Sequence, residues 1–346
     1  MPRRPPPPHE VIRYIIRRLL VAVLLLAIIS LVTFGIFFLL PKLAGQSTDD
    51  LAARYLGREV TPEGLAGVKA KLGLDDPFLV RYWEFVQGIF VGADYKFGTS
   101  VTHCPAPCMG FSYRTNEPVF DLLLDRAPVT FSIALGAAVL WLLSGVTIGV
   151  ISALKRGSVF DRASMSAALA GVSLPMFFTG LVSIWLVCRQ LKLLPTPRYH
   201  EFLDNPATWA QALILPWITL AFLYAAMYAR LTRAGMLETM GEDYIRTARA
   251  KGLPERTVIT RHGLRSALTP IITIFGLDIG LLLGGAVITE TTFSFAGLGQ
   301  LMLQGITRSD LPVALGVTMA TGLFVIIANL VVDILYAVAD PRVRLA

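Results

Sequence analysis

Six stretches of about 20 apolar residues each divide this chain of 346 residues, and no other feature of the sequence restricts its fold as strongly. A helix of that length crosses the hydrocarbon core of a bilayer, where only helices and closed barrels satisfy every backbone polar group. The stretches are Leu19–Leu40, Val129–Leu154, Ala163–Cys188, Trp209–Ala229, Ala267–Glu290 and Pro312–Tyr336. We therefore expect an all-α, polytopic membrane protein with six transmembrane helices.

The composition agrees with this expectation, because 54% of the residues are hydrophobic and only 16% are charged. A net charge of +7 is also found in nucleic-acid-binding proteins. Here, however, the charges lie in short segments between the apolar stretches, and no basic stripe interleaved with aromatic residues is present. We therefore expect no nucleic acid among the partners.

The positions of lysine and arginine predict which side of the membrane each connection faces. Six crossings place both termini on one side. Residues 1–18, 155–162, 230–266 and 337–346 hold 18 of the 31 lysines and arginines in 73 residues, whereas the other three connections hold 13 in 129. By the positive-inside rule, both tails and the loop 230–266 are cytoplasmic.

The first apolar stretch is predicted to anchor the chain and not to act as a cleaved signal. It is longer than a signal core of about 7 to 15 residues, and the sequence PKLAGQS that follows has no convincing cleavage site. The basic, proline-rich tail 1–18 precedes it, and its first eight residues, five of them proline, are expected to be disordered.

The connection over residues 41–128 is too long for a simple loop and must contain structure of its own. Thr61 is a candidate N-cap, Pro62 suits the first helical position, and Gly73 suits a helix end. A second helix is expected over residues 78–91, where the aromatic side chains favour a position in the membrane interface. The pattern predicts a partly helical, extracytoplasmic insert between the first helix and a five-helix core, residues 129–336.

The cytoplasmic loop 230–266 contains the densest run of positive charge in the chain. Residues 244–250 are good helix formers behind Asp243 as a candidate N-cap, Gly252 can end that helix, and Pro254 suits the first turn of another. The pattern predicts a helix, a turn and a second helix against the membrane.

Two interpretations of this loop remain open from its residues alone. Arg261 and Arg265, which repel each other at i,i+4 spacing, favour phosphate headgroups as partners of the second half. In the first half, the small residues Ala248, Ala250 and Gly252 leave a low-profile tip that suits a groove on another protein, which a lipid-facing helix would not need.

Cys104 and Cys108 lie in the insert within the sequence HCPAPC. A disulfide is the main interpretation, because the compartment outside the membrane permits it. The alternative is a metal site that includes His103, although only three candidate ligands are present.

Several motifs of catalysis are missing. The chain contains no G-x-x-x-x-G-K-[ST] phosphate loop, no G-x-S-x-G elbow and no H-E-x-x-H zinc pair. We therefore expect neither ATP hydrolysis nor peptide cleavage by this chain.

Several segments resemble one known family. Arg246, Thr247, Ala248 and, four residues on, Gly252 match the short motif in the loop that permease subunits of ATP-binding-cassette importers present to their ATPase subunits. The order of TPE, KLGLDDP, an aromatic helix and EPVFDLLLDRAPVTFSIALG resembles dipeptide and oligopeptide permeases, and GLLLGGAVITETTFSFAGLGQLM resembles the region that forms their translocation core. The resemblance covers most of the chain and implies the ABC type I importer permease fold.

The resemblance implies a permease subunit of the bacterial inner membrane that takes up di- or oligopeptides, with nickel or another small solute as the alternative substrate. Its expected partners are a homologous second permease subunit, two ATPase subunits, an extracytoplasmic substrate-binding protein and membrane lipids. ATP and magnesium would bind to the ATPase subunits, so no cofactor is expected in this chain. The ATPase-coupling residues would be Tyr244, Arg246, Thr247, Ala248, Arg249, Ala250, Lys251 and Gly252.

Asp278 is the only ionisable residue near the middle of any apolar stretch. Such residues normally face a bundle interior or water. Either Asp278 lines the translocation pathway and meets the amino end of a peptide, or its carboxyl group is hydrogen-bonded to a neighbouring helix. Glu290 lies near the end of its stretch, where its charge is expected to reach the interface.

Glycines at positions 276, 280 and 284 recur every four residues around Asp278, and Gly285 follows. Gly145 and Gly149 repeat the pattern in the second stretch. Such faces predict close helix packing. With Asp278, we also assign Gly280, Gly284 and Gly285 to the candidate pathway, where they would let two halves slide past each other.

Two other classes of membrane protein fit less well. An ion-coupled secondary transporter would be expected to show inverted repeats and several intramembrane carboxylates, and this chain has one such carboxylate. An ion channel would be expected to show a repeated filter motif or a ring of charge, and neither is present.

Overall fold

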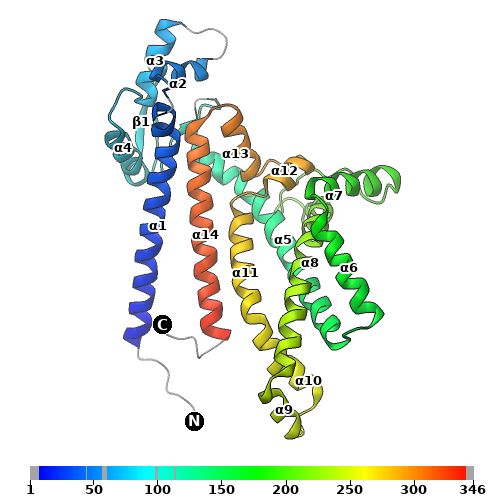
Figure 1. Ribbon diagram of the computed structural model, residues 1–346. Coiled ribbons are helices and arrows are strands. Elements are labelled where there is room, and N and C mark those ends of the chain that lie inside the picture. The colour runs from blue at the N-terminus through cyan, green and yellow to red at the C-terminus, as the bar shows by residue number, and fades with distance from the viewer. Residues whose placement is uncertain (1–7, 44, 57–60, 98–99, 113, 340–346) are drawn as a thin grey trace. The chain divides into compact units, whose positions relative to one another are not determined.

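The computed structural model describes residues 8–43, 45–56, 61–97, 100–112 and 114–339. The chain divides into two compact units, which we describe separately: residues 1–128 with 297–326, and residues 129–296 with 327–346. Both consist mainly of helices (Figure 1). Among the described residues, five helices are long and apolar enough to cross a membrane, or six if one bent pair counts as a single span. The polytopic, mainly α-helical fold is therefore as predicted.

The first unit begins with helix α1 (Pro8–Leu43), whose candidate span is Leu19–Leu39. The helix starts before the predicted end of the tail at residue 18, and the part of the predicted disordered segment before Pro8 lies outside the described residues. Most apolar side chains along the span are exposed, as expected for a helix that faces lipid.

The insert contains three helices, α2 (Thr48–Leu56), α3 (Pro62–Leu72) and α4 (Phe78–Val91). The caps of α3 confirm the prediction, because Thr61 Oγ1 accepts the backbone N–H of Gly64 at 3.1 Å and Gly73 is left-handed, with φ 56°. The bounds of α4 are those expected from the sequence. Helix α2 was not expected, although Ser47 and Asp50 form a reciprocal capping box at its start.

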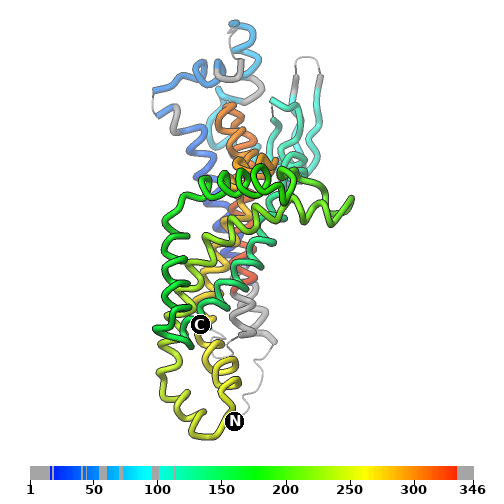
Figure 2. The backbone as a smooth tube through the Cα atoms, turned by 90° about the vertical axis from the view of Figure 1, so that its right-hand side faces the viewer, coloured from blue at the N-terminus to red at the C-terminus, as the bar shows by residue number. Residues whose placement is uncertain are grey.

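Two small antiparallel pairs of strands complete the insert and were not expected. Strands β1 (Ala93–Phe97) and β2 (Ser100–Cys104) form a hairpin, cyan in Figure 2, in which Ala93 lies opposite Cys104. Strands β3 (Phe111–Ser112) and β4 (Glu117–Pro118) form the second pair. Gly92 before the hairpin has φ 87°, and a Cβ atom there would lie 2.7 Å from the carbonyl oxygen of Cys104, so the close approach requires glycine.

The core of the first unit joins the start of helix α5 (Val119–Leu154) to helix α13 (Leu298–Thr307) and the start of helix α14 (Leu311–Ala339). Its buried side chains are Val119, Leu122, Leu123, Leu298, Leu301, Val313, Val317 and Ala320. Asp310, just before α14, is buried and accepts a hydrogen bond from the Ser112 hydroxyl at 2.5 Å. Helix α14 is thereby tied to strand β3.

In the second unit, the third predicted span is not one straight helix. Helix α6 (Val159–Ser173) is followed by α7 (Met176–Ser183) and the π-helical turn η1 (Ile184–Gln190), with a bend of 103° between the two parts. Pro175 causes the break, because it has no backbone N–H and excludes Leu174 from the helical conformation. The prediction of a continuous helix over Ala163–Cys188 was wrong.

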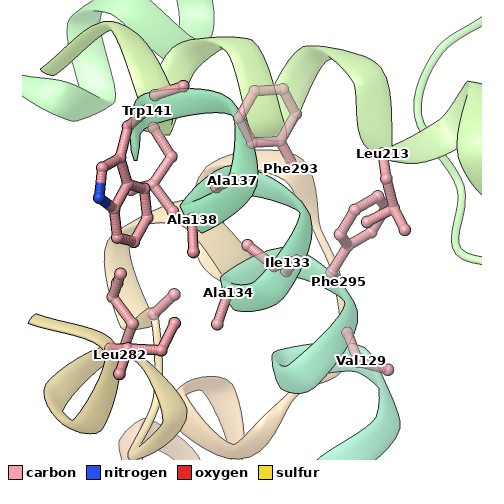
Figure 3. Close-up of a cluster of buried hydrophobic side chains, with 14 of the residues drawn as sticks. Val129, Ile133, Ala134, Ala137, Ala138, Trp141, Leu213, Leu282, Phe293 and Phe295 are labelled. Atoms are coloured by element: carbon pink, nitrogen blue, oxygen red, sulfur yellow. The ribbon is translucent and has the colours of Figure 1, made fainter. Parts of the chain in front are cut away.

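The core of the second unit lies between α5, helix α8 (Pro206–Gly241), helix α11 (Arg265–Leu283) and helix α12 (Val287–Phe293). Figure 3 shows its centre, where side chains from one face of α5 meet those of α8, α11 and the segment after it. The labelled residues include Ile133, Ala137, Trp141, Leu213, Leu282, Phe293 and Phe295. Small residues on α5 leave room for these rings.

Glycines allow α5 and α8 to approach closely. A Cβ atom on Gly149 would lie 2.5 Å from Cβ of Thr232 and 2.7 Å from the carbonyl oxygen of Ala229, and one on Gly145 would lie 2.7 Å from Cβ of Tyr228. The predicted packing role of Gly145 and Gly149 is confirmed.

Candidate functional site

The loop after α8 begins with helix α9 (Asp243–Ala250), shown at the end of α8 in Figure 1. Asp243 is the first helical residue and not the N-cap, which corrects the prediction. Glu242 occupies the cap position without a capping hydrogen bond from its side chain. Gly252 is left-handed with φ 75°, and Pro254 precedes the next helical segment, so the predicted helix, turn and helix is present.

The second half of the loop is continuous with the fifth predicted span. Helix α10 (Glu255–Thr257) leads into the π-helical segment η2 (Val258–Leu264) and then into α11. Arg261 and Arg265 expose their side chains along this segment. Their assignment to the lipid surface stays a prediction.

A small apolar core holds α9 against the start of the second half. Ile245, Ala248 and Val258 are buried together, and Met240 packs against them. Ala248 was expected among the residues that contact a partner. Because Ile245 and Ala248 are three residues apart, they share one helix face, and this face points into the loop's own core. Ala248 therefore supports the exposed face and does not form part of it.

The other coupling candidates form an exposed face, which we call the α9 surface: Tyr244, Arg246, Thr247, Arg249, Ala250, Lys251 and Gly252. Arg249 donates two hydrogen bonds to the Glu255 carboxylate, at 2.7 and 3.1 Å, across the turn. Arg246 forms a longer ion pair with Asp243, at 3.5 Å. The surface combines basic groups with a small-residue tip on a helix whose other face is fixed by packing.

An ion pair that sequence reasoning missed lies between α6 and α8. Arg233 donates to both carboxylate oxygens of Asp161, at 2.6 and 2.9 Å, and the side chain of Asp161 is only 5% exposed. The backbone N–H of Gly157 also donates to Asp161, at 2.9 Å, while Ser158 caps α6. The Ser-x-x-Asp pattern at residues 158–161 is typical of a helix start and could have placed Asp161 there, but it does not indicate Arg233 as the partner. The pair fixes the start of α6 to the last part of α8, which leads into α9.

Asp278 lies on α11 beside an aromatic group from α5 and α8. The hydroxyl of Tyr228 donates to Asp278 Oδ2 at 2.8 Å, and the ring of Trp141 stacks on Tyr224 with centroids 4.6 Å apart. This hydrogen bond to a neighbouring helix is the contact that the second interpretation of Asp278 expects. Asp278 is half-buried, so a place in the pathway stays a prediction.

The glycines near Asp278 divide between packing and helix ending. Gly276 and Gly280 are buried on α11. Gly284 is the C-cap of α11, and Gly285 has φ 134°, so the predicted continuous span to Glu290 is interrupted there. Gly284 and Gly285 therefore form a break that redirects the chain into α12.

Glu290 on α12 is fully buried, which corrects the expectation that its charge reaches the interface. Its Oε1 atom accepts a hydrogen bond from the Thr130 hydroxyl of α5 at 2.7 Å. The break at Gly284 and Gly285 is the reason, because α12 packs back onto the unit's core. The sequence contains no signal that we recognise for this burial.

In the insert, Cys104 and Cys108 are joined by a disulfide with Cα atoms 5.7 Å apart, and both side chains are buried. His103 Nδ1 lies 2.6 Å from Asp94 Oδ1 across the hairpin. With the two sulfurs bonded to each other, the alternative metal site loses two of its three ligands. Within the described residues, no cluster of three or more His, Cys, Asp or Glu side chains is present that would hold a metal ion.

Comparison with known families gives two matches that together span most of the chain. Residues 145–345 match the family described as binding-protein-dependent transport system inner membrane component. Residues 11–134 match the N-terminal part of the corresponding transport system membrane component. The first match contains the whole α9 surface and Asp278.

Individual relatives match over nearly their full lengths. The dipeptide transport system permease protein DppB of Escherichia coli strain K12 is 35% identical, over 96% of this chain and 99% of its own. DppB of Alkalihalophilus pseudofirmus is 34% identical, over 96% of this chain and 100% of its own. Among solved structures, a chain of the MetNI methionine ABC transporter in inward facing conformations aligns with a TM-score of 0.47 and 16% identity, over 64% of this chain and 97% of that chain.

Proposed function

Because the chain belongs to the family of binding-protein-dependent transport system inner membrane components, we propose that it is the permease subunit of an ATP-driven importer for di- or oligopeptides. Two relatives that align over nearly their full lengths are named as dipeptide permeases, which supports peptides as the substrate class. In this proposal the chain forms half of a pore with a homologous second permease subunit, and an extracytoplasmic binding protein delivers the peptide.

The observation that carries the proposal is the α9 surface. Its helix is held by a buried core of Ile245, Ala248 and Val258, so a force on the exposed face is transmitted to the chain and not lost in loop motion. A side chain through which another protein moves this chain must be exposed to that protein, and its backbone must be held in place by packing. We assign the α9 surface to the contact with an ATPase subunit, on the cytoplasmic side together with both termini.

The sequence supports a division of labour between subunits. The chain has no phosphate-loop motif, so ATP and magnesium bind to the two partner ATPase subunits in this proposal. The ion pair of Asp161 and Arg233 then relays movement of α8 to the bent pair α6 and α7. Movement of packed helices of this kind is how shear transitions proceed.

For the pathway, we propose that Asp278 meets the amino group of the peptide. Asp278 accepts from Tyr228 through one oxygen, and a carboxylate has further lone pairs for an ammonium group. The neighbouring rings of Tyr224 and Trp141 add cation–π attraction. Gly280, Gly284 and Gly285 lie on the same segment and let it move against a neighbour.

The test is transport by the assembled complex in proteoliposomes, with labelled dipeptide uptake and ATP hydrolysis measured together. We expect Arg249→Glu to lower uptake at least about tenfold, while the subunit still inserts and assembles. Uptake driven by a proton gradient in the absence of ATP would overturn the importer proposal.

Two controls separate docking from local structure. Arg261→Glu makes the same charge change in the other half of the loop and is expected to leave coupling nearly unchanged. The double exchange Arg249→Glu with Glu255→Arg restores the ion pair inside the loop but not the charge of the surface. If the double variant transports as well as the wild type, Arg249 acts only within the loop and the docking assignment fails.

A further inference from the structure

A cavity of about 770 Å³ lies within the first unit, beside the outer end of the first span. Its lining includes three aromatic side chains, Phe34 and Phe38 of α1 and Phe85 of α4. It also includes charged side chains, with Arg81 and Glu84 on α4 and Asp76 just before it. A cavity lined by both aromatic and oppositely charged side chains suits an amphipathic ligand.

Helix α4 runs beside the membrane span. The hydroxyl of Tyr82 lies 2.7 Å from Ser30 Oγ, and Ser30 is well inside the span Leu19–Leu39 of α1. The ring of Phe34, one turn further along α1, also contacts Phe78 and Tyr82. Helix α4 is therefore at the depth of one leaflet and not out in water.

The outward face of α4 supports this position. Trp83 is 65% exposed and Phe90 is 77% exposed, and exposed Leu79 and Val91 lie on the same helix. Tryptophan and other aromatic side chains concentrate where lipid headgroups meet the hydrocarbon. This face is suited to contact lipid. The cavity lies on the opposite side of α4, where Arg81, Glu84 and Phe85 line it, and it reaches the depth of the span at Phe34 of α1.

Arg81 is the main polar group of the cavity wall. Its guanidinium carbon lies 4.2 Å from the centre of the Phe38 ring, and Nη1 donates to the carbonyl oxygen of Gly73 at 3.2 Å. Its Nε atom is buried without a hydrogen-bond acceptor, and Arg81 forms no ion pair within the part of the chain that the structure describes. Because Nε has almost no accessible surface, a ligand in the cavity would be reached by the terminal nitrogens of Arg81. A guanidinium without an ion-pair partner is suited to bind a phosphate through them.

We propose that this cavity binds the headgroup of an aminophospholipid from the adjacent leaflet. Arg81 contacts the phosphate, Glu84 and Asp76 contact the primary ammonium group, and the first carbons of an acyl chain pack on Phe34 and Phe85. Two carboxylates in the cavity lining disfavour an anionic headgroup such as phosphatidylglycerol, because like charges would be brought together. The proposal rests on the position of α4 in the membrane and not on the transported substrate.

The test measures which lipid stays with the protein. The assembled complex is reconstituted in nanodiscs with equal amounts of phosphatidylethanolamine, phosphatidylcholine and phosphatidylglycerol, extracted in mild detergent, and analysed by native mass spectrometry. We expect phosphatidylethanolamine to be retained about tenfold over the other two, the effect of one charge-assisted hydrogen bond.

Variants of the charged lining residues give distinct outcomes. Arg81→Ala is expected to reduce retention of every phospholipid to background, and Arg81→Lys to keep part of it. Glu84→Gln, which changes an exposed side chain, is expected to keep binding but to remove the preference for the primary ammonium group. Lys42→Ala removes an exposed cation at the same end of α1 that does not line the cavity, and it is expected to behave as the wild type.

Several results would overturn the proposal. One such result is equal lipid retention by the wild type and Arg81→Ala, when tryptophan fluorescence shows the same melting temperature for both. It would show that Arg81 does not bind the phosphate. A preference for phosphatidylglycerol contradicts the role of the carboxylates. If a dipeptide at millimolar concentration displaces the bound lipid, the cavity belongs to the peptide. Should Arg81→Ala fail to fold, the Glu84→Gln comparison still decides the matter.

Discussion

In the insert, a disulfide closes the short loop between Cys104 and Cys108, and polar contacts such as Ser112 with Asp310 join it to a segment far away in the sequence. In the five-helix core, α5 and α8 instead meet through Gly145 and Gly149, with backbone nearly touching side chain. Lipid explains the difference. Between helices in a bilayer, burial of apolar surface provides little driving force, so close packing must provide it. The part of the insert outside the bilayer can use a cross-link and hydrogen bonds.

The largest effect is expected where the core has no space. Gly149→Leu adds a side chain where a Cβ atom alone would lie 2.5 Å from Thr232 and 2.7 Å from a backbone oxygen. The backbone oxygen of Ala229 cannot move away without the helix, so α5 and α8 must separate, at a cost of about 3 kcal/mol. We expect loss of the folded subunit, measured as the monodisperse fraction after extraction in detergent.

The matched change in the insert is Gly67→Ala. Gly67 lies in α3, and nothing is within 4 Å of the position of its Cβ atom. Replacement of a helical glycine by alanine then gains up to about 1 kcal/mol. If Gly67→Ala were as harmful as Gly149→Leu, or Gly149→Leu were tolerated, the contrast between the two regions would be wrong.

This contrast also shows what the sequence could predict. The spacing of Gly145 and Gly149 predicts a close helix contact, because such a contact depends only on which residues share a helix face. The third span was mispredicted because hydropathy measures length and not direction, so the effect of Pro175 on the backbone of Leu174 was overlooked. The burial of Glu290 depends on the break at Gly284 and Gly285, which a search for continuous apolar stretches cannot detect.

The second prediction concerns the disulfide. Cys104→Ser should lower the unfolding free energy of the insert by about 2 kcal/mol, the chain-entropy value for so short a loop. The measurement is limited proteolysis of residues 93–118 against temperature, with and without dithiothreitol. Cys188→Ser is the control, since Cys188 is not in the disulfide and lies in the core. A wild-type insert that is insensitive to dithiothreitol would show that the cross-link is not needed there.

The third prediction compares an ion pair in each region. Asp161→Asn removes the carboxylate that accepts both hydrogen bonds from the Arg233 guanidinium. Because such charge-assisted bonds are strong, we expect a severalfold loss of peptide taken up per ATP hydrolysed. Asp49→Asn breaks the ion pair of Asp49 with Lys69 in the insert, where Asp49 is 60% exposed, and should have little effect. Exchange of the two charges, Asp161→Arg with Arg233→Asp, should recover part of the coupling if Arg233 positions α6. No recovery, with normal assembly, would show that the pair has only a structural role.

Polar contacts were the least predictable part of the molecule. Asp161 and Arg233 are 72 residues apart and Ser112 and Asp310 are 198 apart, so no local pattern joins the partners. The helix that carries most of the candidate coupling residues was easier to predict, because its signals lie within one short stretch of sequence. Even there, the sequence identified the segment but not the inward face that Ala248 shares with Ile245.

The smallest expected effect is a pH dependence that belongs to the first unit. Burial raises the pKa of Asp310 above its usual range, although the Ser112 hydroxyl and the backbone N–H groups of Arg114 and Val313 favour the charged form. Folding therefore favours the protonated carboxyl. Its contribution to the unfolding free energy is fully present below the ordinary aspartate pKa of about 3.9 and falls, by at most about 1.4 kcal/mol per pH unit, as the pH rises through the raised pKa.

Asparagine at position 310 has the shape of the aspartate side chain but cannot ionise. The thermal midpoint of Asp310→Asn should therefore lack the decrease with rising pH that Asp310 gives the wild type. The measurement is the difference in midpoint between the two proteins across the acid range, since other carboxyl groups titrate equally in both. Asp125→Asn, at an exposed position of α5, is the control and should follow the wild type. If the midpoints of the wild type and Asp310→Asn change in parallel with pH, the contact between β3 and α14 carries no titrating charge. The contrast between a polar insert and a close-packed core would then rest on the disulfide and the glycines.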